Sequence, residues 1–345
     1  MTTDTTRRTR PGDPFRGRRR LTWVALTGLV FVSFGLAIGT GTVPIPMSDA
    51  LGVIASHFGL GELPDGAANA VVWNIRMPRW LLGFTVGAAL GIVGAVLQGS
   101  LRNELADPHL LGIGPGAAIG AALGASAGGT RGAIAGGVFA GVLTAFALRR
   151  LASGPTIDPT RIILLGAALS LALGAWVGFV VFGSDRGSVP PLEFWLLGSL
   201  SAATWSTATT TAVFVTLSTA GLFMMSKTLD VLALGEREAS YLGVDTHLVG
   251  TVLLIVSGAI VGVTVGAVGV VAFVGLVVPL LIRKGVGPSF RHVLPAAVVG
   301  GGVFVLLADV AARSIINPVE IPVGLVTAAV GGPVFLWLIA RKSNV

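Results

Sequence analysis

Long stretches of uncharged, mostly apolar residues alternate with short polar connections along almost the whole chain. A helix needs about 20 such residues to cross the hydrocarbon core of a membrane. The pattern predicts an all-α polytopic membrane protein with about ten transmembrane helices. In chain order these predicted crossings are 21–40, 77–101, 108–127, 131–150, 160–183, 204–226, 247–268, 271–283, 290–312 and 321–340.

Two of the apolar stretches are longer than one crossing requires. The uncharged stretch 246–282 would be about 55 Å long as a single helix, against a hydrocarbon core of about 30 Å. It therefore predicts one full crossing followed by a second, shorter one. In the stretch 194–226 we expect a short helix or re-entrant turn around Trp195–Ser201, before the crossing that follows Thr204.

The composition agrees with lipid as the solvent of this chain. Of its 345 residues, 53% are hydrophobic and 11% are charged, whereas soluble domains carry about 25% charged residues. The chain has no cysteine, which excludes disulfides and thiolate metal sites.

The basic residues are distributed unevenly. Residues 1–20 hold seven arginines and two aspartates, which supply +5 of the net charge of +7. This cluster precedes the first crossing and predicts a cytoplasmic tail that lies against anionic lipid, not a nucleic-acid-binding surface. A cleaved signal peptide over 1–48 is the alternative, but the apolar stretch is long and no small-residue cleavage motif closes it.

With the N-terminus inside and ten crossings, 18 of the 23 Lys and Arg residues fall on the cytoplasmic side, as the positive-inside rule requires. The C-terminus is then cytoplasmic as well. Five basic residues remain on the outer side: Arg76, Arg79, Arg131, Arg186 and Arg313.

An inverted repeat is also indicated. The segment Gly87–Ala95 resembles Gly258–Ala267, and the two lie on crossings of opposite predicted direction. Inverted repeats are common in transporters. Glycines at four-residue spacing also let helices pack closely, so this match alone does not identify a transporter.

The sequence offers little chemistry for an enzyme. Its four histidines lie in connections or at helix ends and lack metal-ligand spacing, and there is neither a nucleophile motif nor a phosphate-binding loop. We therefore predict no catalytic residue, no metal ligand and no cofactor. An intramembrane enzyme is disfavoured, and any ATP-driven step requires a separate subunit.

Asp309 is the only acidic residue within a predicted crossing, near its outer end. We interpret it as a carboxylate paired close to the interface. A secondary carrier driven by an ion gradient is the alternative, because such carriers bury carboxylates as proton relays.

Two polar connections are candidates for partner binding. Arg76, Arg79 and Arg313 run against the charge bias, so they either reach lipid phosphate or form a docking platform for an extracytoplasmic protein. The segment at about 228–243 is too polar to cross the membrane and too apolar for a free loop. It either lies on the membrane surface or acts as a cytoplasmic lever that fits a motor subunit.

Motifs in these connections and in the neighbouring helices resemble those of a known family. The chain resembles the FecCD-type ABC importer permeases, which move ferric siderophores, haem and cobalamin, over about residues 70–342. Eight motifs in order carry it: 76–79 (RMPR), 94–99 (GAVLQG), 102–108 (RNELADP), 110–116 (LLGIGPG), 194–200 (FWLLGSL), 234–243 (LGEREASYLG), 269–279 (GVVAFVGLVVP) and 320–324 (EIPVG).

We therefore expect two parts, the basic cytoplasmic tail (1–20) that the arginine cluster indicates and a single transmembrane permease domain (21–345) in the cell membrane. The resemblance implies a homodimer or close heterodimer, with the pathway between the subunits and the crossing at about 162–184 lining it. It also implies two ATPase subunits inside and a substrate-binding protein outside.

The family's functional positions map onto named residues here. The resemblance implies that Arg76, Arg79 and, with a looser match, Arg313 receive carboxylates of the binding protein. It places the ATPase contacts within the coupling segment, with Arg237, Glu238 and Leu242 touching the ATPase. The coupling residues are Leu234, Gly235, Arg237, Glu238, Ala239, Leu242 and Gly243.

Two residues depart from the family pattern in the turn after the second crossing. Glu104 stands where proline is frequent, and His109 where an acidic or polar residue is frequent, which leaves gating there open. For the cargo we expect an iron complex, a ferric siderophore in first place, because the segment 195–200 looks more like iron-complex members. Haem and cobalamin remain alternatives.

Overall fold

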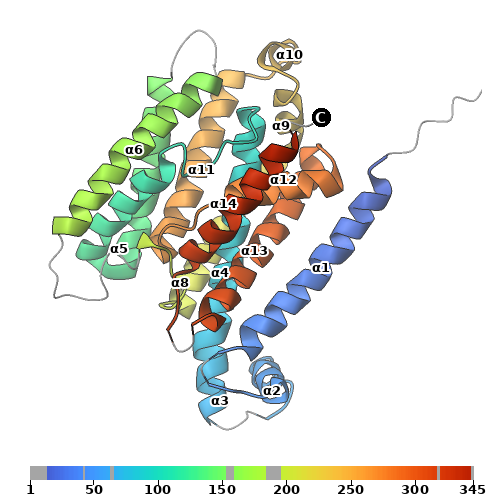
Figure 1. Cartoon of the computed structure of the whole chain (residues 1–345), viewed down its shortest axis with the longest axis vertical. Helices are drawn as coiled ribbons and strands as arrows, with labels where there is room; N and C mark the ends of the chain where they lie inside the picture. The colour runs from blue at the N-terminus through green and yellow to red at the C-terminus, as the bar shows by residue number, and fades with distance from the viewer. Residues whose placement is uncertain are drawn as a thin grey trace, which may run out of the picture.

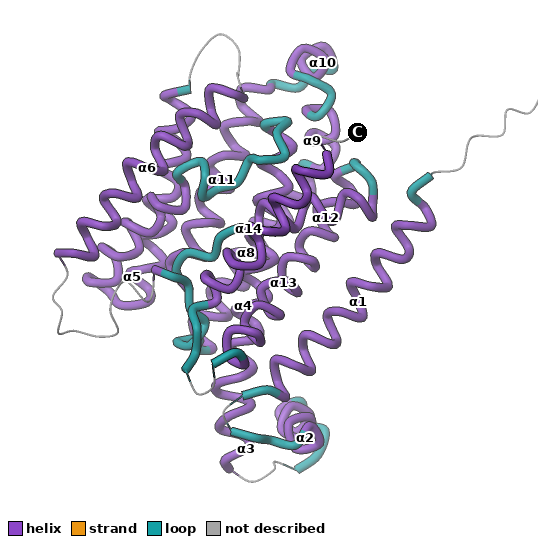
Figure 2. Tube along the Cα trace, in the orientation of Figure 1, coloured by secondary structure: helices purple, strands orange, loops and turns teal. Residues whose placement is uncertain are grey.

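The computed structural model describes residues 14–41, 43–62, 66–152, 159–183, 196–316 and 319–342. Within these ranges every regular element is a helix, as Figure 2 shows. Seven of the described helical stretches are long and apolar enough to cross a membrane, in agreement with an all-α membrane protein.

The elements follow one another in this order: α1 (Arg16–Gly39), α2 (Met47–His57), α3 (Gly66–Val71), η1 (Val72–Arg76), α4 (Met77–Ser100), α5 (Ile113–Leu151), α6 (Pro159–Gly183), α8 (Trp205–Met224), α9 (Ser226–Leu232), α10 (Glu236–Tyr241), α11 (Thr246–Val268), α12 (Val274–Val286), α13 (Phe290–Ser314) and α14 (Val323–Lys342).

The long helices form a bundle around α4 (Figure 1). Helix α4 packs against α8, α11, α12 and α13, and α1 packs along α13 at one edge. The short helices α2 and α3 lie at one end of the bundle, and α9 and α10 lie at the other. We name these ends the α2 end and the α9 end.

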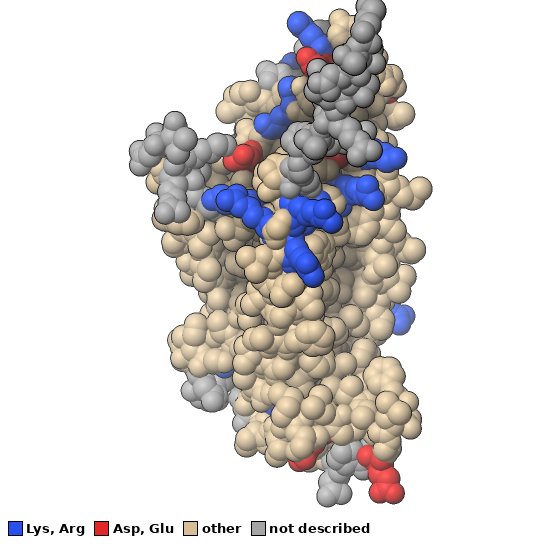
Figure 3. All heavy atoms as spheres, turned by 90° about the vertical axis from the view of Figure 1, so that its right-hand side faces the viewer, with Lys and Arg blue, Asp and Glu red and all other residues tan. Residues whose placement is uncertain are grey.

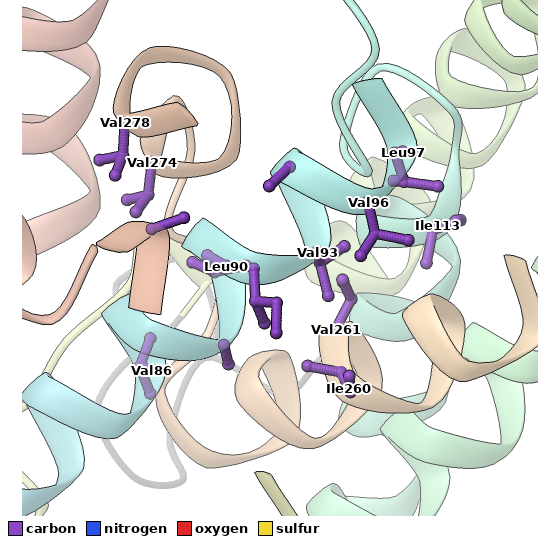
Figure 4. Packing of buried hydrophobic residues seen from close by; sticks show 14 of the residues in the cluster. Val86, Leu90, Val93, Val96, Leu97, Ile113, Ile260, Val261, Val274 and Val278 are labelled. Atoms are coloured by element: carbon purple, nitrogen blue, oxygen red, sulfur yellow. The ribbon is translucent and has the colours of Figure 1, made fainter. Parts of the chain in front are cut away.

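Helix α4 is buried along nearly its whole length because small residues let its neighbours come close. A Cβ atom at Gly87 would overlap the backbone of Gly301 on α13, and one at Gly94 would overlap the backbone of Gly275 on α12. Between these glycines, side chains such as Leu90 fill the core that Figure 4 shows.

Helix α5 consists of two arms that fold back on each other. Its backbone is non-helical at Gly128 and Gly129, where Gly129 has φ 56°, a region that favours glycine. The arms touch at closely matched glycines, such as Gly124 on one and Gly132 on the other. The second arm matches the helix expected at 131–150, whereas the first begins at Ile113, five residues after the expected start of the helix at 108–127.

The long stretch 246–282 divides as its length predicts. Helix α11 ends at Val268, an irregular segment follows, and the shorter α12 begins at Val274 after Phe273, whose φ is 67°.

Residues 197–204 are also irregular, and the Ser199 amide donates to the carbonyl of Val268 at 2.8 Å. The short helix or re-entrant turn expected around Trp195–Ser201 corresponds, from residue 196 onward, to this segment bonded to the end of α11, and Trp195 lies outside the described residues.

The first helix begins earlier than expected. Helix α1 starts at Arg16, so the last arginines of the segment 1–20 belong to its first turns, while residues 1–13 lie outside the described residues. The Arg19 side chain donates to the carbonyl of Val286 at 3.4 Å, at the end of α12. Most Lys and Arg side chains on the face in Figure 3 lie in its upper part, toward the α9 end.

Candidate functional site

The first candidate site, at the α2 end, contains the three outer arginines. Arg76 closes η1, and its side chain is buried. Its guanidinium donates to the carbonyl of Ile38 and, at 2.5 Å, to that of Val43. Because the last carbonyls of a helix lack partners within the helix, Arg76 completes the hydrogen bonding at the end of α1.

Arg313, near the end of α13, reaches the same place from the other side. It donates to the carbonyl of Thr40 at 3.1 Å and to that of Ala37 at 3.4 Å. A cation is favourable there, since the C-terminal end of a helix carries partial negative charge. Two arginines that lie far apart in the sequence thus converge on the end of α1.

Arg79, on the first turn of α4, links two carboxylates. It forms ion pairs with Asp309 and with Glu320, each at 2.9 Å. Asp309 also forms an ion pair with Arg313 at 3.2 Å. Asp309 is 2% exposed, while the Glu320 side chain is 38% exposed. The arginine cluster, defined as Arg76, Arg79, Arg313, Asp309 and Glu320, therefore has one carboxylate inside and one at its edge.

The structure brings the three predicted docking arginines together at the α2 end, but it buries their side chains instead of exposing them on the surface. Burial follows from their partners, which are helix-end carbonyls and Asp309. The interpretation of Asp309 as a paired carboxylate is confirmed. The four-residue spacing of Asp309 and Arg313 in one helix was a signal for this pair. The docking role stays a prediction.

The second candidate site, at the α9 end, is the coupling segment. It consists of α9, α10 and the turns beside them, so the expected range of about 228–243 is divided between two short helices. Leu234 and Leu242 are 64% and 63% exposed, although both are apolar. Arg237 and Glu238 are exposed as well, together with Gly243. Apolar and charged side chains thus share one outward surface.

The other two predicted coupling residues support this surface from within. Ala239 is buried. Gly235 is also buried and has φ 138°, a conformation that L side chains rarely adopt. Gly235 and Ala239 therefore shape the turn and the buried side of α10, and they are not available for contact with a partner.

Two polar contacts hold the coupling segment to the bundle. Asp230 accepts the Phe290 amide at 2.7 Å and the Ser289 hydroxyl at 3.0 Å, so a residue of α9 caps the start of α13. Glu236 accepts the Thr246 hydroxyl at 3.4 Å at the start of α11. The coupling segment is consequently linked to two long helices.

Gln98 is a buried polar residue of α4 that was not among the predicted site residues. Its amide donates to the carbonyls of Gly275 and Leu276 at 3.2 and 3.1 Å, and its oxygen accepts Arg283 at 3.1 Å. An amide in an otherwise apolar crossing was the available signal, because buried polar groups need partners. Gln98 ties α4 to α12 at the α9 end.

The described residues contain no group of three or more His, Asp or Glu side chains that could hold a metal ion. The polar groups of the two candidate sites described above are instead bonded to the backbone, paired with each other, or turned outward. Such an arrangement can hold helices in place and can bind other proteins.

Comparison with known proteins points to one family. The profile of the FecCD transport family matches residues 29–341. The hemin transport system permease protein HmuU of Yersinia pestis is 38% identical over 290 residues, covering 80% of this chain and 86% of that protein. The cobalamin import system permease protein BtuC of Halobacterium salinarum is 37% identical over 306 residues, covering 88% and 81%.

A solved structure agrees with the sequence relatives. A structure described as a metal-chelate type ABC transporter in an inward-facing conformation has a TM-score of 0.79 and 29% identity, covering 93% of this chain and 99% of that one. The fold, the membrane-crossing helices and the relatives all indicate a multi-pass transport subunit of the cell membrane and not an enzyme. This chain belongs to the FecCD transport family of ABC transporter permeases.

Proposed function

We propose that this chain is the membrane-spanning subunit of an ATP-driven importer that takes up an iron complex, a ferric siderophore in first place. The observation that carries the ATP-driven mechanism is the coupling segment: Leu234 and Leu242 are exposed on a short helical element that Asp230 fastens to α13. An exposed apolar surface rimmed by charges is typical of a protein interface. A cytoplasmic ATPase subunit is its proposed partner.

The proposed orientation has the α9 end in the cytoplasm, with both termini on that side. The concentration of Lys and Arg toward the α9 end in Figure 3 supports it through the positive-inside rule. The proposed crossings are ten: α1, α4, the two arms of α5, α6, α8, α11, α12, α13 and α14.

The proposed second permease subunit covers α6. Only 11% of the most apolar part of α6 is buried within the chain, compared with 83% for the span that contains α4. Large apolar side chains of α6, such as Leu171 and Phe182, are exposed. In this proposal the dimer, whether of identical or closely similar subunits, forms the pathway along α6.

The proposed binding protein docks at the α2 end, where Arg76, Arg79 and Arg313 remain predicted to receive its carboxylates. Since these arginines are bonded within the chain, docking requires an exchange of partners. Glu320 is the partly exposed partner of Arg79. We propose that a carboxylate of the binding protein replaces Glu320 on Arg79.

The cargo is proposed from the family and the metal-chelate neighbour. Haem is the alternative that the permease HmuU supports, and cobalamin is the alternative that BtuC supports. Because these two relatives are almost equally similar to this chain, an uptake measurement is needed to distinguish the possible cargoes.

Reconstitution in lipid vesicles tests the proposal. The chain is combined with a candidate ABC ATPase subunit and a candidate substrate-binding protein from the same organism, and uptake of a ferric siderophore, haem and cobalamin is measured. We expect ATP-dependent accumulation of the siderophore and none without the ATPase. Uptake driven by a proton gradient without the ATPase would overturn the mechanism, and preferred uptake of haem or cobalamin would change the cargo alone.

A further inference from the structure

A pocket opens toward the α2 end between the second arm of α5 and the start of α8. Its volume is about 760 Å³ where it is counted together with the solvent at its mouth. The pocket is separate from the arginine cluster and from the coupling segment. Polar residues that line it are Thr130, Arg131, Thr204, Ser206, Thr207 and Thr210.

The chemistry of this pocket suits an anion. Arg131 is exposed and makes no ion pair within the part of the chain that the structure describes, and the described residues that line the pocket include no acidic side chain. Hydroxyl-bearing residues share the pocket with this guanidinium, including Thr207 and Thr210. A guanidinium with hydroxyl donors beside it is well suited to a phosphate group, which accepts several hydrogen bonds at once.

The surface of α5 that runs away from the pocket is apolar and exposed. Residues spaced by four lie close to one face of a helix. Two steps of four lead from Arg131 to Phe139 and a third leads to Leu143, and both of these side chains are exposed. The second arm of α5 thus changes from polar at its start to apolar toward the middle of the bundle.

Helix α8 shows the same change from polar to apolar. Its first turns carry Ser206 and Thr210 in the pocket. At the spacing of three and four residues that keeps side chains on one face, Val213 and Leu217 come next, and both are exposed. Two exposed apolar rows therefore begin where the polar pocket ends.

We propose that this pocket binds the phosphate headgroup of an anionic glycerophospholipid in the leaflet at the α2 end. Arg131 and the pocket hydroxyls hold the phosphate, and the acyl chains lie along Phe139 and Leu143 on α5 and along Val213 and Leu217 on α8. The positive-inside rule disfavours a basic residue at the proposed outer end of a membrane protein. Binding of a lipid phosphate would explain why Arg131 lies there.

The proposal commits to a lipid because of the apolar rows. A free phosphate would use only the pocket, and a carboxylate of the binding protein would have no use for Phe139 or Leu217. Helix α11 packs against both α5 and α8, so a lipid here bridges two helices that share a neighbour. This inference rests on the membrane location of the chain and not on the identity of its cargo.

Native mass spectrometry of the purified full-length chain tests the site. Phosphatidylglycerol, phosphatidylcholine or inorganic phosphate is added to the wild type and to the variants Arg131→Ala and Thr210→Val. The controls are Arg150→Ala, an exposed arginine at the other end of the same arm, and Thr209→Val, an exposed threonine of α8 outside the pocket.

We expect Arg131→Ala to weaken binding of phosphatidylglycerol about tenfold, as the loss of a charge-assisted hydrogen bond implies, and Thr210→Val to weaken it less. Both controls should bind as the wild type does, and phosphatidylcholine should bind more weakly than phosphatidylglycerol. Equal binding of phosphatidylglycerol by Arg131→Ala and Arg150→Ala would overturn the proposal.

Two further outcomes would also overturn it. Displacement of phosphatidylglycerol by an equal concentration of inorganic phosphate would assign the pocket to a free anion. If Arg131→Ala lost binding-protein docking while it kept its lipid binding, the pocket would belong to that partner.

Discussion

The two ends of the bundle use charged residues in opposite ways. At the α2 end, the side chains of Arg79 and Arg313 are buried and share Asp309, and Arg79 also pairs with Glu320, so both cations have partners inside the subunit. At the α9 end, Arg237 and Glu238 are exposed beside the apolar side chain of Leu242. Similar residues in two polar connections therefore hold one subunit together at one end and remain accessible to a partner at the other.

The difference has a physical cause in the helix ends that meet there. The end of α1 offers carbonyl groups without helical partners, and Arg76 and Arg313 satisfy them at Ile38, Ala37 and Thr40. At the α9 end, Asp230 caps the start of α13. The exposed side chains of the coupling segment, such as Leu242, take no part in that cap and are left for a partner.

The largest expected effect on stability comes from removing the buried carboxylate at the α2 end. Asp309→Ala leaves Arg79 and Arg313 without their shared carboxylate and should lower the free energy of unfolding by about 3–5 kcal/mol, because one partner of a buried pair is removed. Denaturant unfolding in detergent micelles measures it. An unchanged unfolding free energy would contradict a structural role for the cluster.

The matched control is Glu320→Gln, which removes the partly exposed partner of Arg79. Its cost should stay below about 1 kcal/mol, as for exposed ion pairs. In the proposed exchange of partners, the same variant frees Arg79 and should bind the binding protein more tightly. Weaker binding by Glu320→Gln would argue against that exchange.

An intermediate effect is expected from Asp230→Ala at the α9 end. Loss of the cap on α13 should cost about 1 kcal/mol, and it should also reduce the stimulation of ATP hydrolysis by the binding protein, since α9 loses its link to α13. Asp245→Ala is the control, because Asp245 caps the start of its own helix by accepting the Leu248 amide at 2.9 Å. If ATP hydrolysis is stimulated equally in both variants, the link through Asp230 does not transmit motion.

The smallest effect on stability is expected from Leu242→Asp. An exposed substitution should change the unfolding free energy by no more than about 0.5 kcal/mol, yet it should prevent co-purification with the ATPase subunit. Leu60→Asp is the control, since Leu60 is exposed at the α2 end. Retention of the ATPase by Leu242→Asp, or its loss from Leu60→Asp, would contradict the proposed interface.

The positions of the helices could be predicted closely from the sequence, and the start of α1 shows where such predictions err. The shorter helix expected at 271–283 is found as α12 at 274–286, because length and apolarity set its place. Helix α1 starts at Arg16 instead of residue 21. Arginine is a good helix former, so the helix extends beyond the apolar run into the basic segment.

Apart from the pair of Asp309 and Arg313, which lie four residues apart in one helix, the partners of the arginines could not be predicted in the same way. Arg79 and Asp309 lie 230 residues apart in the chain, and Arg313 and Thr40 lie 273 apart. No local pattern connects such positions. The coupling segment was easier to recognise because its polarity differs from that of the helices on both sides, although its sequence did not indicate that Ala239 would be buried.

The sequence by itself determined that this chain is a bundle of membrane-crossing helices of the FecCD family, because apolar length and motif order are local properties that survive any packing. Only the tertiary structure decided which charged residues are buried and which face outward. That choice depends on which helix ends meet in space, and a buried charge is stable only where the fold supplies a partner.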